Sequence, residues 1–408
     1  QDRRAKMEYP MGPSHMRTTK EMYDSLSYLT EEEKELYVVT NPNRLSTKIE
    51  KVNPIPVDEN GDPILYTPKI EGIDERFKDV VMENAYKMYG NPLPKIIEER
   101  VEKELTSIIG NGFAVIYMIS RDLVRKSLED GYLVGSRGSI GSSLAATLSD
   151  ITEVNPMSPH YVCNSCQWSI FFEGNEEMLS GYDLPETFKE LLDPEQFTEE
   201  SHQFFLNAFA QSFNVPEEKM KEAMMKHDGS CPKCKEATLI REGQNIPFET
   251  FLGFNGDKVP DIDLNFSGVY QPVAHRFTKE MFGEAYVFRA GTITTVAEKT
   301  AFAFVDKYFK NHEVLISSAE VDRLSKKVQG AKDSTGKHPG GILVVPNYME
   351  MTDFSPYQYP ANDVNNEFMT SHFDFHSIHD NILKLDILGH DAPTLLRYLQ
   401  EYTDVDPK

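Results

Sequence analysis

Four cysteines and a single tryptophan are present among the 408 residues, and long apolar runs are absent. No stretch approaches the roughly 20 apolar residues that a membrane-spanning helix needs. The first ten residues, QDRRAKMEYP, contain neither the apolar core of a signal peptide nor an initiator methionine. We therefore expect a cytoplasmic chain that does not bind membranes and that is a piece of a longer protein.

Basic residues are also scarce, because 42 lysines and arginines stand against 65 acidic residues, for a formal charge of −23. Proteins that coat nucleic acid depend on lysine and arginine to neutralise phosphates. This balance argues against such a coating protein, so any role on nucleic acid must be local and assisted by metal ions. A hydrophobic fraction of 39% is ordinary for a folded chain, and the length suits two or three domains.

The four cysteines form two Cys-x-x-Cys pairs, CNSC (Cys163, Cys166) and CPKC (Cys231, Cys234). Two such pairs with no cysteine left over are typical of a tetrahedral zinc site. Two disulfides or redox pairs are the alternative, which a reducing compartment disfavours. The pairs lie farther apart than the roughly 15 to 20 residues of a compact zinc ribbon. A folded segment must therefore fill the gap.

That segment, residues 183 to 228, is acidic and amphipathic. Its aromatic residues fall near helical spacing, Pro216 interrupts the pattern, and a methionine stripe follows, which predicts two helices. The stripe is either the core of a small unit or a surface for a partner, and the sequence does not choose. Its residues are Phe197, Phe204, Phe205, Phe209, Phe213, Met220, Met224 and Met225.

Other local patterns predict elements along the chain. Thr18 with Glu21 and Thr30 with Glu33 have the spacing of capping boxes that open short helices. Prolines between residues 54 and 68 indicate a linker. An apolar stripe at Ile97, Val101, Leu105 and Ile108 predicts a helix that ends at Gly110 and Gly112. FAVIYMI, residues 113 to 119, predicts a buried strand, followed by a short helix from Ser120 to Gly131.

The stretch YLVGSRGSIGSSLAATL predicts a strand at residues 132 to 134, a loop, and a helix beginning near Leu144. Glycines allow a close backbone approach, while serine hydroxyls, the Arg137 guanidinium and a helix N-terminus all favour an anion. This chemistry is that of a phosphate-binding loop. The alternative is an ordinary Gly/Ser turn in which Arg137 forms a structural ion pair.

Three aspartates complete the pattern. In VPDIDLNFSG, Asp261 and Asp263 would share one face of a strand and repel each other. In NILKLDILGH, Asp386 is surrounded by apolar residues, and a buried carboxylate without a partner is costly. Two Mg²⁺ ions about 4 Å apart would neutralise all three and support phosphoryl chemistry. The residues alone leave a nuclease, a phosphatase and a polymerase open.

The stretches GSRGSIGSS, PDIDLNFSG, GKHPGGILVVP and HFDFHSIHDNILKLDILG, with the four-cysteine element between the first two, carry a resemblance. Together they resemble the alpha subunit of bacterial DNA polymerase III, PolC type, over roughly residues 70 to 400. RTTKEM is similar to the stretch where that family's PHP domain ends.

The resemblance implies an α+β fold: a polymerase-beta-like nucleotidyltransferase palm, which is a mixed sheet with helices, plus a helical thumb and an inserted four-cysteine zinc element. It implies catalytic roles for Asp261, Asp263 and Asp386, which would hold two Mg²⁺. Arg137, Gly138, Ser139 and Lys384 would bind the nucleotide phosphates. Cys163, Cys166, Cys231 and Cys234 would hold one structural Zn²⁺. The thumb lysines would follow the duplex backbone: Lys299, Lys307, Lys326, Lys327 and Lys332.

The implied order of parts is the end of the PHP region and a linker (1–69), three palm segments (70–162, 235–290 and 336–408), the zinc insertion (163–234) and the thumb (291–335). The activity implied is template-directed DNA synthesis from primer–template DNA and deoxynucleoside triphosphates. The sliding clamp and other replisome subunits would bind regions outside this chain. The fingers and the exonuclease would also be missing, so we expect the isolated chain to be weakly active or inactive.

Three other interpretations remain. A zinc-dependent replisome interaction module would have no activity of its own. A metal-dependent phosphodiesterase is disfavoured because no histidines cluster near Asp261 and Asp263. The third is a second transition-metal site, whose ligands would be His372, Asp374, His376, His379 and Asp380.

Overall fold

The computed structural model describes residues 15–50, 54–253, 258–360 and 363–406, so the first ten residues discussed above lie outside it. The chain divides into two compact units, Gln1–Pro54 and Ile55–Lys408. The described part of the first unit contains α1 (Thr19–Ser25), α2 (Glu31–Lys34), a π-helical turn η1 (Glu35–Thr40) and α3 (Asn41–Ser46). Both expected capping boxes are confirmed, with Thr18 and Thr30 as the capping residues.

In the second unit, α4 (Ile73–Tyr89), α5 (Lys95–Gly110) and α6 (Ala114–Glu129) precede the short α7 (Leu144–Leu148). Helix α5 buries Ile97, Val101, Leu105 and Ile108, as the apolar spacing predicted. These helices form one hydrophobic core with the sheet described below.

The expected strand at residues 113 to 119 is wrong, because this stretch opens helix α6, which continues without a break to Glu129. Ser120 lies inside the helix rather than capping it. Every residue from Phe113 to Ser120 is buried, so the first two turns are apolar on all sides. The sequence of a helix that is buried on all sides has no amphipathic periodicity, so it cannot be distinguished from that of a buried strand.

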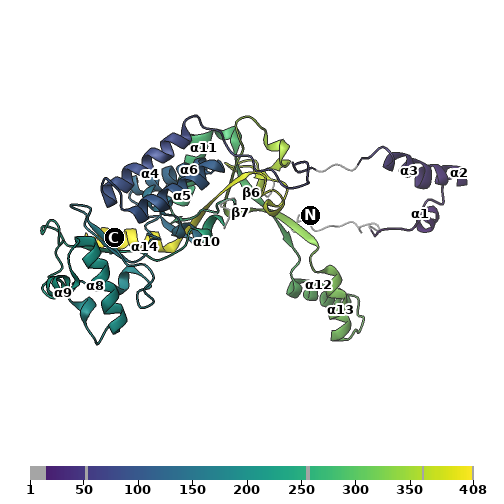
Figure 1. Cartoon of the computed structure of the whole chain (residues 1–408). Helices are drawn as coiled ribbons and strands as arrows, with labels where there is room; N and C mark the ends of the chain where they lie inside the picture. The colour runs from purple at the N-terminus through teal and green to yellow at the C-terminus, as the bar shows by residue number, and fades with distance from the viewer. Residues whose placement is uncertain (1–14, 51–53, 254–257, 361–362, 407–408) are drawn as a thin grey trace. The chain divides into compact units, whose positions relative to one another are not determined.

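A seven-stranded mixed sheet occupies the centre of this unit (Figure 1), in agreement with the α+β expectation. Its order is β1 (Gly135–Arg137), β5 (Asp263–Ser267), β10 (Leu383–His390), β7 (Lys332–Val344), β6 (Val287–Thr295), β9 (Thr370–Ser371) and β8 (Tyr357–Gln358). Strands β5 and β10 are parallel, whereas β1–β5 and β10–β7 are antiparallel.

One local expectation changes. The strand expected at 132–134 lies at 135–137 instead. Strand β7 runs through Gly340 and Gly341. A Cβ atom on Gly340 would lie 2.5 Å from Leu388 Cδ2 and 2.9 Å from the Ile387 carbonyl oxygen. Glycine at this position therefore permits the close approach of β7 to β10.

Strands β6 and β7 form a long antiparallel pair, and α12 (Glu298–Asn311) and α13 (Ser318–Val328) connect its far ends (Figure 1). The segment expected to be helical between 291 and 335 therefore begins and ends as strand. The other α-helices are α10 (Glu249–Leu252), α11 (Gln271–Phe282) and α14 (Asp391–Thr403). Among the described residues, no helix is long and apolar enough to cross a membrane.

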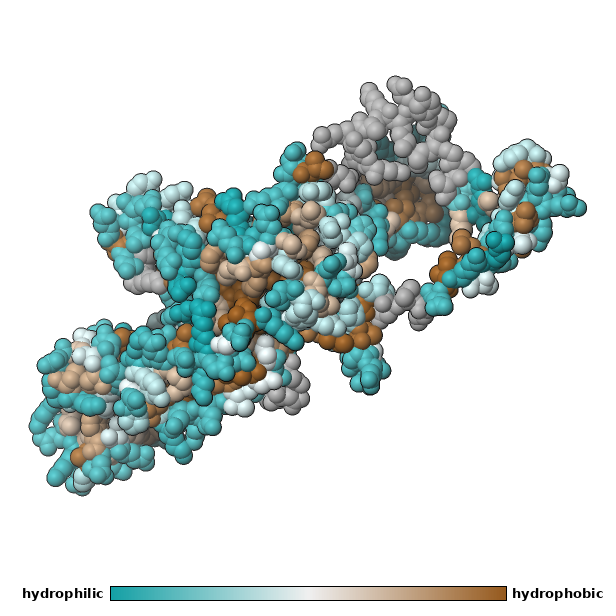
Figure 2. Space-filling model, turned by 90° about the horizontal axis from the view of Figure 1, so that it is seen from above, coloured by the Kyte–Doolittle hydropathy of each residue, from teal (hydrophilic) through white to brown (hydrophobic). Residues whose placement is uncertain are grey.

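The cysteine region has its own three-stranded sheet, β3–β2–β4, and its own hydrophobic core. Its elements are β2 (His160–Val162), β3 (Ser169–Phe171), β4 (Ile240–Glu242), α8 (Glu199–Phe213) and α9 (Glu217–Met224). Phe205 and Phe209 are fully buried, and Met220 and Met224 are almost fully buried. Met225, in contrast, is 52% exposed. The aromatic and methionine stripe is thus mainly core. The surface over α8 and α9, at lower left in Figure 2, is largely hydrophilic.

Short 3-10 turns complete the described structure. They are η2 (Gly138–Ser142), η3 (Gly181–Asp183), η4 (Glu190–Leu192), η5 (Glu284–Tyr286), η6 (Met351–Asp353) and η8 (Phe375–Ser377).

Candidate functional site

The three aspartates gather at neighbouring strands of the large sheet. Asp263 opens β5 and pairs in register with Asp386 of the parallel strand β10. Asp261 lies just before β5 rather than on it, which differs from the expectation that one strand carries both. One carboxylate oxygen from each aspartate lies within 4.8 Å of the others. Asp261 is exposed, Asp263 is half-buried and Asp386 is buried.

The electrostatics of this cluster favour a cation. Burial raises the pKa of Asp263, and the charges of Asp261 and Asp386 raise it further. Lys384 Nζ lies 2.7 Å from Asp386 Oδ2. The other oxygen, Asp386 Oδ1, is buried and has no hydrogen-bond partner among the described residues. A buried acceptor without a partner is costly. The carboxylate oxygens of the three aspartates therefore fit a divalent cation, which prefers oxygen ligands.

His338 lies beside the cluster, with Nδ1 4.0 Å from Asp386 Oδ1. The backbone N–H of Gly341 donates to His338 Nδ1 at 2.7 Å. Burial lowers the pKa of His338, and an imidazole whose Nδ1 accepts a hydrogen bond carries its proton on Nε2. The motif that contains His338 stood out in the sequence, but the sequence assigned it no role.

Arg289 forms hydrogen bonds with the backbone at His338. Its guanidinium donates to the carbonyl oxygens of His338 and Pro339 and to Nδ1 of the buried His275. Burial, followed by the charge of Arg289, lowers the pKa of His275 to about 4. Sequence reasoning missed both residues, because nothing in their local patterns distinguishes them from other residues of β6 and α11.

The predicted phosphate-binding residues lie beside the aspartates. Arg137 of β1 pairs in register with Asp263 of β5. Gly138, with φ of +77°, turns the chain there, and a Cβ atom on it would lie 3.9 Å from Asp263 Oδ2. Ser139 follows in the turn η2. Arg137, Gly138 and Ser139 therefore adjoin the carboxylates, with Lys384 on the neighbouring strand.

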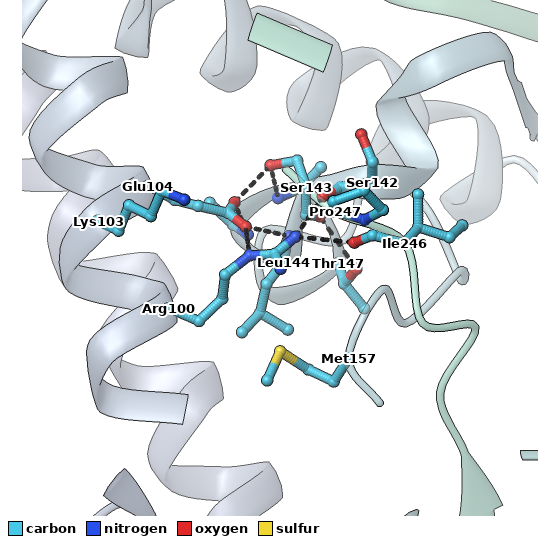
Figure 3. A network of polar contacts seen from close by, with 12 residues as sticks. Arg100, Lys103, Glu104, Ser142, Ser143, Leu144, Thr147, Met157, Ile246 and Pro247 are labelled. Carbon is cyan, nitrogen blue, oxygen red and sulfur yellow. Dashed lines mark hydrogen bonds and ion pairs between the residues drawn. The ribbon is translucent and has the colours of Figure 1, made fainter. Parts of the chain in front are cut away.

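The helix after this turn does not serve an anion as expected. Helix α7 begins at Leu144, but the backbone N–H groups of Leu144 and Ala145 donate to the carboxylate of Glu104, at 3.0 and 2.9 Å. The N–H of Ala146 donates to the Ser143 hydroxyl. A buried side chain of the protein thus takes up the free donors that would attract a phosphate. Figure 3 shows Glu104 reaching this helix end from α5.

The four cysteines also come together. Cys163 and Cys234 sulfurs are 3.8 Å apart, and those of Cys166 and Cys231 are 3.6 Å apart. Both separations are longer than the roughly 2.05 Å of a disulfide bond, and all four cysteines are free thiols in the structure. Burial raises the pKa of the Cys231 thiol to about 12. Four sulfurs from two facing pairs fit a tetrahedral zinc ion, which binds thiolates by displacing their protons.

The histidine-rich stretch from His372 to Asp380 does not bring a comparable group of metal-binding side chains together. His376 Nδ1 pairs with Asp374 at 2.7 Å, and His379 Nε2 with Asp380 at 3.3 Å. His372 Nδ1 contacts the side chain of Gln358 instead. Within the described ranges, the only groups of three or more metal-binding side chains are the cysteines and the three aspartates. The second transition-metal site is therefore not supported.

Comparison with known proteins matches the sequence family described as "Bacterial DNA polymerase III alpha NTPase domain", over residues 75–320 and 310–389. The chain is 53% identical over 394 residues to the "DNA polymerase III PolC-type" of Halalkalibacterium halodurans. It is 52% and 53% identical over 395 residues to proteins of the same name from Staphylococcus epidermidis and Staphylococcus aureus. Each alignment covers 97% of this chain and 24% of the relative. The chain therefore belongs to the bacterial DNA polymerase III alpha family, of the PolC type.

Proposed function

We propose that this chain carries the nucleotidyl-transfer site of a replicative DNA polymerase, which joins deoxynucleoside triphosphates to a primer 3′-hydroxyl under the direction of a template. The observation that carries the proposal is the register of β1, β5 and β10, which places Arg137, Asp263 and Asp386 side by side. Kinship with polymerases of the PolC type favours this reaction over the nuclease and phosphatase alternatives.

The positions of the aspartates, Arg137 and Lys384 suggest a role for each in this reaction. Asp261, Asp263 and Asp386 would hold two Mg²⁺, which when bound activate the attacking hydroxyl and neutralise charge on the phosphates. Arg137 would hold phosphate oxygens through its planar fork, at the turn formed by Gly138 and Ser139. Lys384, now 2.7 Å from Asp386, is near enough to meet phosphate as well.

The proposed parts follow the sequence expectation. Residues 70–162, 235–290 and 336–408 would form the palm, and 291–335 the thumb with its exposed lysines. Residues 163–234 would form the zinc element, with one Zn²⁺ on the four cysteines, and 1–69 the end of the PHP region. The partners would be primer–template DNA and deoxynucleoside triphosphates. Clamp and other replisome contacts would involve the parts of the relatives that this chain does not match.

The test uses the complete polymerase that contains this chain, with Asp261→Asn as the variant and Asp79→Asn as the matched control. Asp79 is exposed on α4 and belongs to neither group of metal-binding side chains. We expect Asp261→Asn to lose Mg²⁺-dependent binding of a templated dNTP and primer extension, while Asp79→Asn keeps both. Equal activity in the two variants would contradict the proposal.

The alternative is a zinc-dependent interaction module, and the observation in its favour is the separate hydrophobic core around the cysteines. A pure interaction module shows no nucleotide binding that depends on Asp261. The same experiment therefore distinguishes the two functions.

A further inference from the structure

Helix α5 carries a carboxylate where its apolar stripe should continue. Glu104 has no exposed surface, although the residues around it on the buried face are Val101, Leu105 and Ile108. A charged side chain is almost never fully buried unless it is paired and hydrogen-bonded. The position of Glu104 therefore calls for a specific set of partners.

Those partners come from one neighbouring segment and one residue of α5 (Figure 3). Glu104 Oε1 accepts from Arg100 Nε and from the Leu144 N–H. Glu104 Oε2 accepts from the Ser143 hydroxyl at 2.8 Å and from the Ala145 N–H. Four donors thus converge on two oxygens, and all but Arg100 belong to the start of α7.

Arg100 extends this contact to the turn η2. While its Nε pairs with Glu104, its terminal nitrogen donates to the Ser142 carbonyl oxygen at 2.7 Å and to the Ile246 carbonyl oxygen at 3.2 Å. The Ser142 hydroxyl in turn donates to the Ser139 carbonyl oxygen at 2.7 Å. A continuous line of hydrogen bonds therefore runs from the buried Glu104 through Arg100 and Ser142 to Ser139.

The far end of this line is the proposed phosphate-binding turn. Ser139 follows Gly138, whose α-carbon lies beside the carboxylate of Asp263. Apart from the buried Ile140, the turn η2 consists of glycine and serine, so its apolar anchoring is confined to one side chain. Polar contacts that hold such a turn in place set where its donors sit relative to a bound phosphate.

We propose that Glu104 and Arg100 are positioning residues for the triphosphate of the incoming nucleotide. Glu104 fixes the start of α7 and orients Arg100, and Arg100 holds η2 through Ser142 so that Arg137, Gly138 and Ser139 face the phosphates. This inference rests on the proposed function, since it concerns the same site. Neither Glu104 nor Arg100 touches the nucleotide.

Arg100→Lys and Ser142→Ala test the line without unpairing Glu104. Lysine keeps a positive charge beside Glu104, but it lacks the second nitrogen with which Arg100 contacts Glu104 and the Ser142 carbonyl oxygen at the same time. Ser142→Ala removes only the hydroxyl that contacts Ser139. The matched control is Glu99→Gln on the same helix, where Glu99 is exposed and forms a surface pair with Lys95.

The measurement is single-nucleotide addition of dTTP opposite a template adenine by the complete polymerase, with active sites titrated. We expect the KM for dTTP to rise roughly tenfold in Arg100→Lys and Ser142→Ala, by more than kcat falls. Glu99→Gln should match the unmodified protein. Glu104→Gln should show the largest rise in KM; if it fails to fold, the other two variants decide.

A purely structural role gives a different result. It lowers the melting temperature and the fraction of active sites but leaves the KM of the remaining sites unchanged, and that outcome would overturn the inference. Failure of the proposed function is separate, because it requires that the unmodified polymerase itself add no nucleotide.

Discussion

The four cysteines and the three aspartates both bring potential metal ligands within a few ångströms of one another, but they are placed differently in the fold. Cys163 and Cys231 are buried inside a small core whose strands and helices pack around them. The aspartates lie on a sheet that has a large core of its own, and Asp261 is exposed. Structural metal sites are closed, whereas catalytic ones keep a side open to substrate.

This difference indicates how each region should respond to removal of the metal ion proposed for it. The cysteine region is small, and its core is built around the ligands, so its folding should depend on the ion. Asp263 and Asp386 sit on strands that are hydrogen-bonded on both sides, so the sheet should persist without metal.

Cys231→Ser should unfold the cysteine region while the large sheet stays folded. Structural zinc contributes on the order of 10 kcal/mol to the folding of small zinc domains, and a serine hydroxyl does not replace a thiolate. Hydrogen exchange across residues 160 to 242, together with zinc analysis, measures the effect. The control is Ser165→Ala, at an exposed position within the first pair. A folded, zinc-free protein with four readily alkylated thiols would break the contrast.

Asp263→Asn in the complete polymerase should reduce nucleotide addition by a factor on the order of 10³, because one metal position loses a charged ligand. The melting temperature of the metal-free protein should stay the same or rise slightly, since the change relieves repulsion from Asp261 and Asp386. Primer extension and thermal melting measure the two effects, with Asp79→Asn as the control. A variant that melts much lower yet remains active would make Asp263 a structural residue.

Arg137→Lys should lower kcat/KM for nucleotide addition about tenfold, or about 1.4 kcal/mol, although the charge is kept. A guanidinium can hold two phosphate oxygens in a plane, which an ammonium cannot. Steady-state kinetics on the complete polymerase provide the measurement, and Arg125→Lys, at a half-exposed position on α6, is the control. Unchanged kinetics would leave Arg137 as a structural ion pair.

The pH dependence of stability should carry a small signature of the aspartates. The pKa of Asp263 is raised in the folded protein, so the folded state binds protons more readily than the unfolded state there. The contribution of Asp263 to the stability of the folded protein therefore becomes more favourable as the pH falls through the raised pKa. This contribution is lost as the pH rises. In magnesium-free buffer, Asp263→Asn should stabilise the protein more at pH 7 than at about pH 3.5, which lies below the ordinary pKa of an aspartate, as measured by thermal melting. An equal effect at both pH values would exclude this repulsion.

Local signals in the sequence anticipated several parts of the structure. The capping boxes, the α5 stripe, the spacing within each Cys-x-x-Cys motif and the α8–α9 pattern each depend on residues close together in the chain. The start of α7 near Leu144 was also predicted correctly. The strand predicted at residues 113 to 119 was wrong, because its burial on all sides removed the periodicity on which the prediction depended.

The partners of Glu104 could not be predicted from its own segment of the sequence. The sequence pattern made the start of α7 an anion site, and the structure fills that place with a carboxylate from a helix some forty residues earlier. A signal existed, since Glu104 falls on the buried face of α5 with Arg100 one turn before it. Only the packing of α5 against α7 identifies what that carboxylate binds.

The sequence alone identified the family of this chain, and it predicted the ligand residues and the repulsion between Asp261 and Asp263. The tertiary structure alone decided that Asp386 stands in register with Asp263, that Arg137 adjoins them from β1, and that Glu104 occupies the helix end. Ligand chemistry is a property of residue types and short spacings, which the chain carries locally. Distances between strands far apart in sequence follow from hydrogen-bond register and core packing, which exist only once the sheet has formed.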